Sequence, residues 1–233
     1  YEIPEGSKNS KGRAMQNLIN IEQDDRVKAF ICTQDLKDEE YVNSNYVIMA
    51  TKMGQVKKTS LEQYSRPRSN GINAITIKDG DELLEAKLTN GNSQIMLAVK
   101  SGKAIRFEES KTRPMGRNAS GVRGIRLKDN KDEVVGMISV NDMDANILVV
   151  SENGFGKRSS LEDYRLTNRG GKGVKTISIT EKTGKLVTLK SVSDNDDLMI
   201  INKSGIAIRM QVEDLRVMGR ATQGVKVISL KDG

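Results

Sequence analysis

The chain of 233 residues contains no histidine, no tryptophan and one cysteine, Cys32. Histidine is the commonest general base and a frequent metal ligand, so its absence argues against an enzyme that uses one and against a zinc site. A single cysteine cannot form an intrachain disulfide, which fits a reducing cytoplasm, and Cys32 is expected to be an inert, buried thiol. No apolar run approaches the roughly 18 residues that a membrane-spanning helix needs, so none is expected. The first residues, Tyr1 to Glu5, resemble neither a signal peptide nor a start with methionine, which predicts a piece of a longer protein.

Apolar residues make up only 36% of the chain and charged residues 30%, with a net charge of +7. With three Phe and five Tyr, the core must consist mainly of Ile, Val, Leu and Met. The length suits one large all-β domain or two small ones.

A module with two marked glycines recurs along the chain. The first of the two, the hairpin glycine, lies seven residues after an apolar residue that opens a predicted strand. The second, the loop glycine, precedes a β-branched residue, and successive loop glycines are 50, 52 and 51 residues apart. A period near 50 without helical patterning indicates a propeller-like array. The hairpin glycines are Gly54, Gly102, Gly154 and Gly205, and the loop glycines are Gly71, Gly121, Gly173 and Gly224.

Each module predicts four strands, as in a propeller blade. A short apolar strand leads to the hairpin glycine, a return strand follows, and a third strand begins after the loop glycine at residues 72–77, 122–127, 174–179 and 225–230. A fourth strand closes the unit at residues 83–88, 134–140 and 186–192. The predicted division is a partial blade over 1–46 and repeats over about 47–94, 95–146, 147–197 and 198–233.

The partial blade lacks its hairpin. It contains a basic loop at residues 7–13 and a predicted closing strand near Val27 to Cys32, and the polar stretch from Thr33 to Asn45 is expected to be a longer loop. Tyr64 and Tyr164 are expected to pack within blades rather than to perform chemistry.

Positive charge follows the repeat. Five windows around the basic loops, residues 6–20, 64–78, 111–128, 164–179 and 215–231, hold 20 of the 38 Lys and Arg and no acid. The rest of the chain holds 18 basic and 31 acidic residues. Recurrent basic stripes of this kind indicate a polyanionic partner.

The loops also carry a family likeness. The segment Arg169-Gly170-Gly171-Lys172-Gly173 matches five of the seven positions of the Q-R-R-G-G-K-G signature of the DNA gyrase A C-terminal domain, which the chain resembles along its whole length. Residues 1–18, 115–127 and 218–225 resemble the same family. In the family the signature lies in the first blade, which this chain lacks, whereas here it lies in the fourth of five loops.

The resemblance implies a six-bladed β-pinwheel whose blades exchange strands, of which this chain covers about four and a half. It implies sequence-tolerant wrapping of double-stranded DNA on a basic rim, so that gyrase introduces negative supercoils. The expected partners are the remainder of gyrase A and the gyrase B protein in an A2B2 holoenzyme, without a membrane. No cofactor or metal is expected in this domain, because ATP and magnesium act elsewhere in the holoenzyme, as does the cleavage tyrosine. The expected location is the bacterial cytoplasm, at the nucleoid.

The candidate DNA-binding residues are the cations of the loops and return strands and the signature glycines. Arginine can bind phosphate oxygens in a bidentate way, and glycine loops bring backbone N–H groups close to them. The candidates are Arg169, Gly170, Gly171, Lys172, Gly173, Lys175, Arg165, Lys157, Arg158, Arg113, Arg117, Arg123, Arg106, Arg216, Arg220, Lys226, Arg209, Arg66, Arg68, Lys57, Lys58, Lys8, Lys11 and Arg13.

Three other functions stay open. The related C-terminal domain of topoisomerase IV would bend DNA to choose substrates. A propeller scaffold would bind proteins through the acidic surface formed by the residues outside the basic windows. A propeller enzyme is disfavoured by the lack of histidine and of paired metal ligands.

Overall fold

The computed structural model describes residues 5–14, 17, 19, 21, 25–68 and 70–229. Strands β1 to β14 account for most of the regular structure in this part of the chain, and the fold is all-β, as predicted. Where residues are described, no helix is long and apolar enough to cross a bilayer.

Four antiparallel hairpins repeat along the chain. Each turns at a hairpin glycine, and at Gly54 the positive φ of 82° is one that other residues rarely adopt. The apolar runs before these turns form the first strands, as expected. The hairpins are β1 (Tyr46–Thr51) with β2 (Gln55–Ser60), β4 (Gln94–Val99) with β5 (Lys103–Glu108), β8 (Asn146–Ser151) with β9 (Phe155–Ser160), and β12 (Asp197–Ile201) with β13 (Ala207–Gln211).

A closing strand lies beside the first strand in three of these units, also as predicted. These strands are β3 (Leu83–Thr89) beside β1, β7 (Val134–Val140) beside β4, and β11 (Leu186–Val192) beside β8. They face one another in succession, since β3 contacts β7 and β7 contacts β11.

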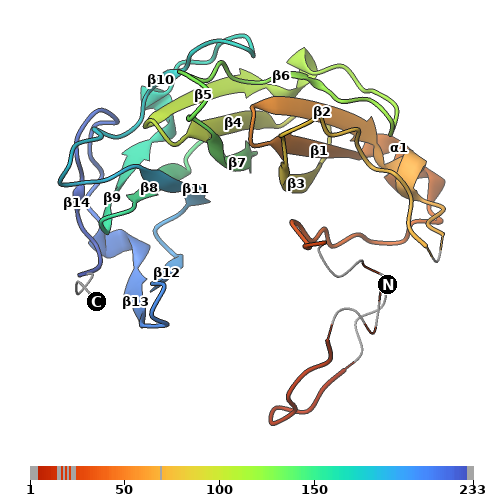
Figure 1. Cartoon of the computed structure of the whole chain (residues 1–233), viewed down its shortest axis with the longest axis horizontal. Coiled ribbons are helices and arrows are strands. Elements are labelled where there is room, and N and C mark those ends of the chain that lie inside the picture. The colour runs from red at the N-terminus through yellow and green to blue at the C-terminus, as the bar shows by residue number, and fades with distance from the viewer. Residues whose placement is uncertain are drawn as a thin grey trace.

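The outer strand of each complete sheet comes from the next repeat. Strand β6 (Val122–Arg123) pairs with β2, β10 (Val174–Lys175) pairs with β5, and β14 (Val225–Lys226) pairs with β9. The sheets therefore read β3-β1-β2-β6, β10-β5-β4-β7 and β11-β8-β9-β14. They follow one another along an open arc, with β6, β10 and β14 on its outer side and β3, β7 and β11 on its inner side (Figure 1). The expected strand exchange is thereby confirmed.

Three local predictions were wrong. The third strands after the loop glycines are only two residues long, and residues 71–78 form no strand, because the described chain has no preceding hairpin for them to join. Residues 25–33 form no strand for the same reason, although Ala29 and Ile31 pack against the core beneath β1 and β3. The stretch expected as a loop contains a helix, α1 (Glu39–Ser44), capped by the Asp38 carboxylate.

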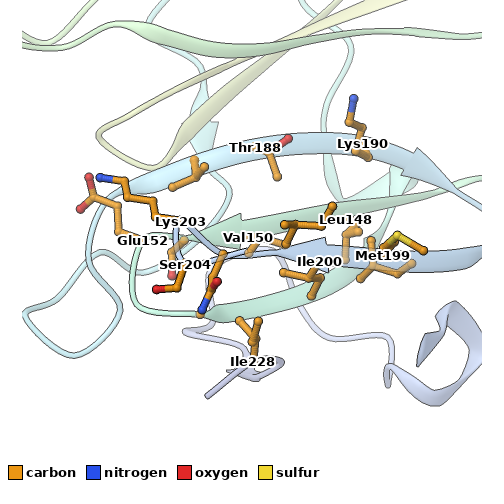
Figure 2. A pocket seen from close by; sticks show the side chains of 16 residues that line it. Leu148, Val150, Glu152, Thr188, Lys190, Met199, Ile200, Lys203, Ser204 and Ile228 are labelled. Carbon is orange, nitrogen blue, oxygen red and sulfur yellow. The ribbon is translucent and has the colours of Figure 1, made fainter. Parts of the chain in front are cut away.

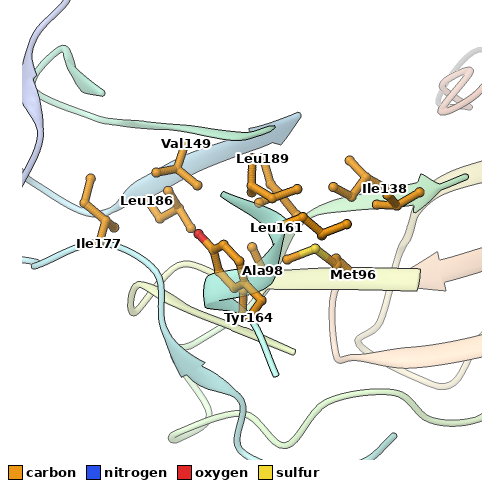
Figure 3. Close-up of a cluster of buried hydrophobic side chains, with 12 residues drawn as sticks. Met96, Ala98, Ile138, Val149, Leu161, Tyr164, Ile177, Leu186 and Leu189 are labelled. Atoms are coloured by element: carbon orange, nitrogen blue, oxygen red, sulfur yellow. The ribbon is translucent and has the colours of Figure 1, made fainter. Parts of the chain in front are cut away.

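A short 3-10 helix follows each return strand. These helices are η2 (Leu61–Tyr64), η3 (Glu109–Lys111), η4 (Leu161–Asp163) and η5 (Val212–Asp214). Figure 3 shows the core at η4, where Leu161 and Tyr164 meet Met96 of one sheet and Leu189 of the next. Tyr164 is 1% exposed and its hydroxyl lies 2.5 Å from that of Thr176, so it packs, as expected.

The last hairpin leaves a groove beside β12. In the described part of the chain no closing strand lies next to β12, and a groove of about 670 Å³ separates it from β8 and β11. Figure 2 shows its mainly aliphatic lining, with Leu148 and Val150 facing Met199 and Ile200. An apolar groove on the inner side is unsuited to a polyanion.

Candidate nucleic-acid interface

The cations of the basic loops form the exposed part of the predicted site. They flank the loop glycines, and those near the exchanged strands lie along the outer side of the arc (Figure 1). We call the exposed members on the arc the rim cations: Arg66, Arg68, Arg113, Arg123, Arg165, Lys172, Lys175, Arg216 and Lys226. Lys8, Lys11 and Arg13 are also exposed, but their loop, residues 7–13, lies away from the arc (Figure 1).

The rim cations have no acidic partner among the described residues. The ion pairs found there lie elsewhere, for example Lys100 with Glu133 at 3.1 Å and Lys28 with Glu82 at 2.8 Å. The acids that form ion pairs therefore partner cations outside this set, and the loop charges remain available to an external anion. Segregation of this kind produces a one-sided positive field.

The signature segment lies on the loop that leads into β10. Lys172 and Gly171 are exposed, whereas Gly170 and Gly173 are partly covered. Gly173 has a φ of 69°, and a Cβ there would lie 2.5 Å from the Ala104 carbonyl oxygen of β5. This glycine is thus required for the loop to approach the neighbouring sheet, so the structure explains it without a ligand.

Two predicted DNA-binding lysines, Lys57 and Lys157, are fully buried. The Lys57 ammonium donates to the carbonyls of Ala74 and Arg117, and that of Lys157 donates to the Gly219 carbonyl at 2.6 Å. Burial lowers the pKa of each from 10.5 to about 8. The prediction that they contact DNA directly is therefore wrong, since a phosphate cannot reach a buried ammonium in this conformation.

A second set of cations lies four residues after each hairpin glycine. We call these the joint cations: Lys58, Arg106, Arg158 and Arg209. Lys58 and Arg158 are buried and Arg106 is partly so, and each of these three donates to carbonyls in or beside the 3-10 helix of the following repeat. The predicted direct DNA contact of Lys58 and Arg158 is corrected for the same reason as that of the buried lysines.

The joint at Lys58 contains an acid that sequence reasoning missed. Glu109 is fully buried, lies 3.8 Å from the Lys58 ammonium, and accepts from the Thr89 hydroxyl at 2.6 Å and the Ser93 amide at 3.3 Å. It stands seven residues after a hairpin glycine, where the other repeats have Leu61, Leu161 and Val212. A lone acid at an apolar repeat position was the available signal.

A third set, the loop arginines, lies four residues before a loop glycine: Arg117, Arg169 and Arg220. Each is partly exposed and donates to the carbonyl two residues after the preceding repeat's loop glycine. Arg169 bonds the Arg123 carbonyl at 3.1 Å and the Lys111 carbonyl at 2.9 Å. The loop arginines therefore link neighbouring repeats, and their contact with DNA stays a prediction.

Comparison with family models identifies the repeat. The model described as "DNA gyrase C-terminal domain, beta-propeller" matches residues 1–34, 45–90, 94–141, 145–193 and 196–233. The chain belongs to this family. The interval 35–44, which the family model leaves unmatched, contains α1 and lies between two matched units.

Relatives and solved structures agree with this assignment. The DNA gyrase A proteins of Staphylococcus epidermidis (strain ATCC 12228 / FDA PCI 1200) and Staphylococcus aureus (strain MRSA252) are each 44% identical over all of this chain. The chain spans 26% of the length of either relative. A topoisomerase IV C-terminal domain superposes with a TM-score of 0.85 at 25% identity, over 94% of this chain and 66% of that one. A DNA gyrase A C-terminal domain gives a TM-score of 0.83 at 24% identity, over 96% and 73%, which shows the shared fold.

The described residues contain no cluster of potential metal ligands. No group of three or more His, Cys, Asp or Glu in this part of the chain could hold an ion. Cys32, expected as a buried thiol, is exposed.

Proposed function

We propose that this chain binds, bends and wraps double-stranded DNA on the outer rim of its arc, with little dependence on base sequence. The observation that carries the proposal is the recurrence of exposed, acid-free cations around each loop glycine, in phase with the blades. Double-stranded DNA carries about one charge per 1.7 Å, so a curved row of cations can neutralise successive phosphates. Phosphate contacts position the duplex but carry no base information.

The cost of bending DNA explains why several basic loops would be needed. Smooth bending of 20–30 base pairs by 40–90° costs on the order of 1–6 kcal/mol, so the contacts must be distributed along the path. With about two phosphates per loop, binding should weaken with salt with a log–log slope of roughly −9. The cations are not interleaved with aromatic side chains, which disfavours a stacking site for single strands.

The proposed context is the gyrase holoenzyme, in which the remainder of gyrase A and the gyrase B protein would complete an A2B2 assembly. There the holoenzyme would use ATP to introduce negative supercoils into the wrapped DNA. This domain would contribute no chemistry or cofactor, and ATP, magnesium and the cleavage tyrosine would act elsewhere. Its site of action would be the nucleoid in the bacterial cytoplasm.

A second candidate is the DNA-bending domain of topoisomerase IV, favoured by the TM-score of 0.85. The 44% identity to gyrase A proteins and the signature segment favour gyrase. To separate them, this chain would replace the matching segment of the S. epidermidis gyrase A protein, which is then assembled with gyrase B. Negative supercoiling of relaxed plasmid supports gyrase, whereas relaxation and decatenation alone would support topoisomerase IV.

DNA binding itself is tested by titrating the chain into a duplex of about 40 base pairs over a salt series. Lys172→Ala on the rim should reduce the magnitude of the salt slope by about 1. The matched control is Lys190→Ala, which removes the same charge from an exposed position on β11, at the inner side. A flat slope for the parent chain, or equal losses in the two variants, would contradict a rim interface and favour a protein-binding scaffold.

A further inference from the structure

Three of the joint cations are bound to the following repeat twice, once by the backbone and once by the side chain. The backbone carbonyl of Arg106 accepts from the Thr167 amide at 2.9 Å. Those of Lys58 and Arg158 accept in the same way from Met115 at 2.7 Å and Met218 at 2.9 Å. The three sites also form the parallel bridges that join a return strand to the next repeat. One residue per repeat therefore fixes where the basic loop of the next repeat leaves its 3-10 helix.

The side chain of Arg106 fixes a second point. Its Nη1 donates to the carbonyls of Leu161 at 2.9 Å and Tyr164 at 3.0 Å, while Nε donates to the Gln94 amide oxygen at 2.7 Å. Burial lowers the pKa of this guanidinium, yet arginine stays charged because its ordinary pKa is so high. Charge-assisted bonds to two carbonyls of η4 and its cap restrain rotation of the next repeat about the backbone joint.

The restrained element is the stem of a basic loop. The rim cation Arg165 directly follows Tyr164, and Lys172 lies on the same loop. A change in the angle at this joint would move these rim cations relative to those of the preceding loop.

Arg209 provides an internal comparison. In the described part of the chain no repeat follows β13, and there the side chain of Arg209 is 70% exposed and pairs with Asp197 of its own hairpin. Arg158 also pairs with an acid, Asp194, but its side chain donates to Leu215 and Glu213 of the next 3-10 helix and its cap. The bridging arrangement thus accompanies a packed following repeat.

We propose that the joint cations Lys58, Arg106 and Arg158 are positioning residues for DNA wrapping, setting the angle between successive repeats and so the curvature of the bound duplex. This inference rests on the proposed function. The cations of this domain thereby fall into two groups. The rim cations contact phosphate, and the joint cations set the curvature of the surface on which those contacts are made.

The test compares Arg106→Gln with Lys172→Ala in the full chain. Binding and end-to-end energy transfer are measured on a doubly labelled duplex of about 40 base pairs over a salt series. Arg106→Gln should leave the salt slope within about 0.5 of the parent value but lower energy transfer at saturation, because the duplex is bent less uniformly. Lys172→Ala should lower the magnitude of the slope by about 1 and leave energy transfer at saturation nearly unchanged. Arg106→Lys should restore part of the bend, since Lys58 occupies the equivalent joint.

Two results of this comparison would overturn the inference. A slope change of about 1 for Arg106→Gln would mean that Arg106 meets phosphate. Unchanged energy transfer together with a lowered melting temperature would mean that it only stabilises the fold. A parent chain that fails to bind DNA would instead refute the proposed function and the part of the inference that concerns a bound duplex, and the joint angle itself is tested without DNA.

A measurement without DNA tests the joint directly. Spin labels are placed at Asn118 and Asn168, two exposed positions on adjacent basic loops, in a Cys32→Ser background. Arg106→Gln should broaden or shift the distance distribution between the labels, and Lys172→Ala should not. An unchanged distribution in Arg106→Gln, below its melting temperature, overturns the inference whether or not DNA binds.

Discussion

At the residue scale, the environment of a lysine or arginine in these modules follows from its position relative to the hairpin glycine and the loop glycine. Cations three or four residues after a hairpin glycine lie in the return strand, and they are buried or partly buried where a following repeat packs against them, as at Lys157 and Arg158, whereas Arg209 is exposed. Cations beside a loop glycine lie in water, as at Lys172. Burying an unpaired charge is costly, so each buried cation has carbonyl or carboxylate partners.

The lysine at position 157 should make stability depend on alkaline pH. Its pKa is about 8 in the folded chain and about 10.5 when unfolded, so the unfolded state binds more protons between these values. The free energy of unfolding should therefore rise with pH over this window, by up to about 1.4 kcal/mol per pH unit from this group. Urea unfolding from pH 7.5 to 9.5 measures the slope, and Lys157→Met should remove this part of it. Lys190→Met, also the loss of one positive charge, is the control. A Lys157→Met variant whose stability parallels the parent chain at every pH would refute the assignment.

The pair Lys58 and Glu109 should show strong coupling. Replacing Glu109 by Gln leaves a buried ammonium without its counter-charge, which should destabilise the chain by about 3–5 kcal/mol. Lys58→Met with Glu109→Gln should cost less than the sum of the two single variants, by at least about 1 kcal/mol. Chemical denaturation of all four chains measures the cycle, and additive losses would show that the two groups do not interact.

At the element scale, the loop before each exchanged strand has to approach the preceding sheet closely. Gly173 makes this approach against Ala104, and Gly121 and Gly224 make it against Val56 and Gly156. Because the exchanged strands are short, the glycine and the few hydrogen bonds around it carry much of the connection.

Gly173→Ala should therefore weaken the junction between β10 and β5. The left-handed backbone alone costs an alanine roughly 1–2 kcal/mol, and the contact with the Ala104 carbonyl adds to this. Gly116→Ala is the control, because no atom lies within 4 Å of its Cβ position and its φ is outside the left-handed region. Thermal unfolding should show a clear loss for the first variant and less than about 0.5 kcal/mol for the second. Similar small losses in both would contradict the close approach.

The elements that the sequence predicted correctly are those whose formation depends only on residues of the same repeat. Hairpins at Gly54 and Gly102 follow from four apolar residues and a turn glycine, and the closing strands follow from their own apolar runs. The third strands could not be predicted in length, because their partner belongs to another repeat. The site was predicted only in part for a related reason. Windows free of acid identify the basic loops, but they do not give the exposure of a cation, which depends on the neighbouring sheet. Lys172 on a loop is exposed, whereas Lys157 on a return strand is buried.

At the scale of the whole molecule, the arc places the exposed loops on its outer side and its apolar contacts between sheets (Figure 1). The curvature of any duplex bound there would be the sum of the angles at successive junctions. A rigid arc would bend DNA by a fixed amount per repeat.

DNA bound to this rim should stabilise the entire arc. A duplex at 100 times its dissociation constant adds about 2.7 kcal/mol, which for a chain of this size corresponds to a rise in melting temperature on the order of 5–10 °C. The rise should disappear as added salt weakens binding. Differential scanning fluorimetry with and without a duplex of about 40 base pairs measures it. A rise that persists at high salt would indicate contacts other than those to phosphate.

Strand exchange also has a consequence for synthesis on the ribosome. The sheet that begins with β1 receives its last strand, β6, only when residues 122 and 123 have emerged, although its hairpin is complete by residue 60. At roughly 5–20 residues per second, each hairpin waits several seconds with an open edge. Folding of each sheet is therefore completed one repeat later than its synthesis. The exchanged strand that follows each newly made loop pairs with the open edge of the preceding sheet.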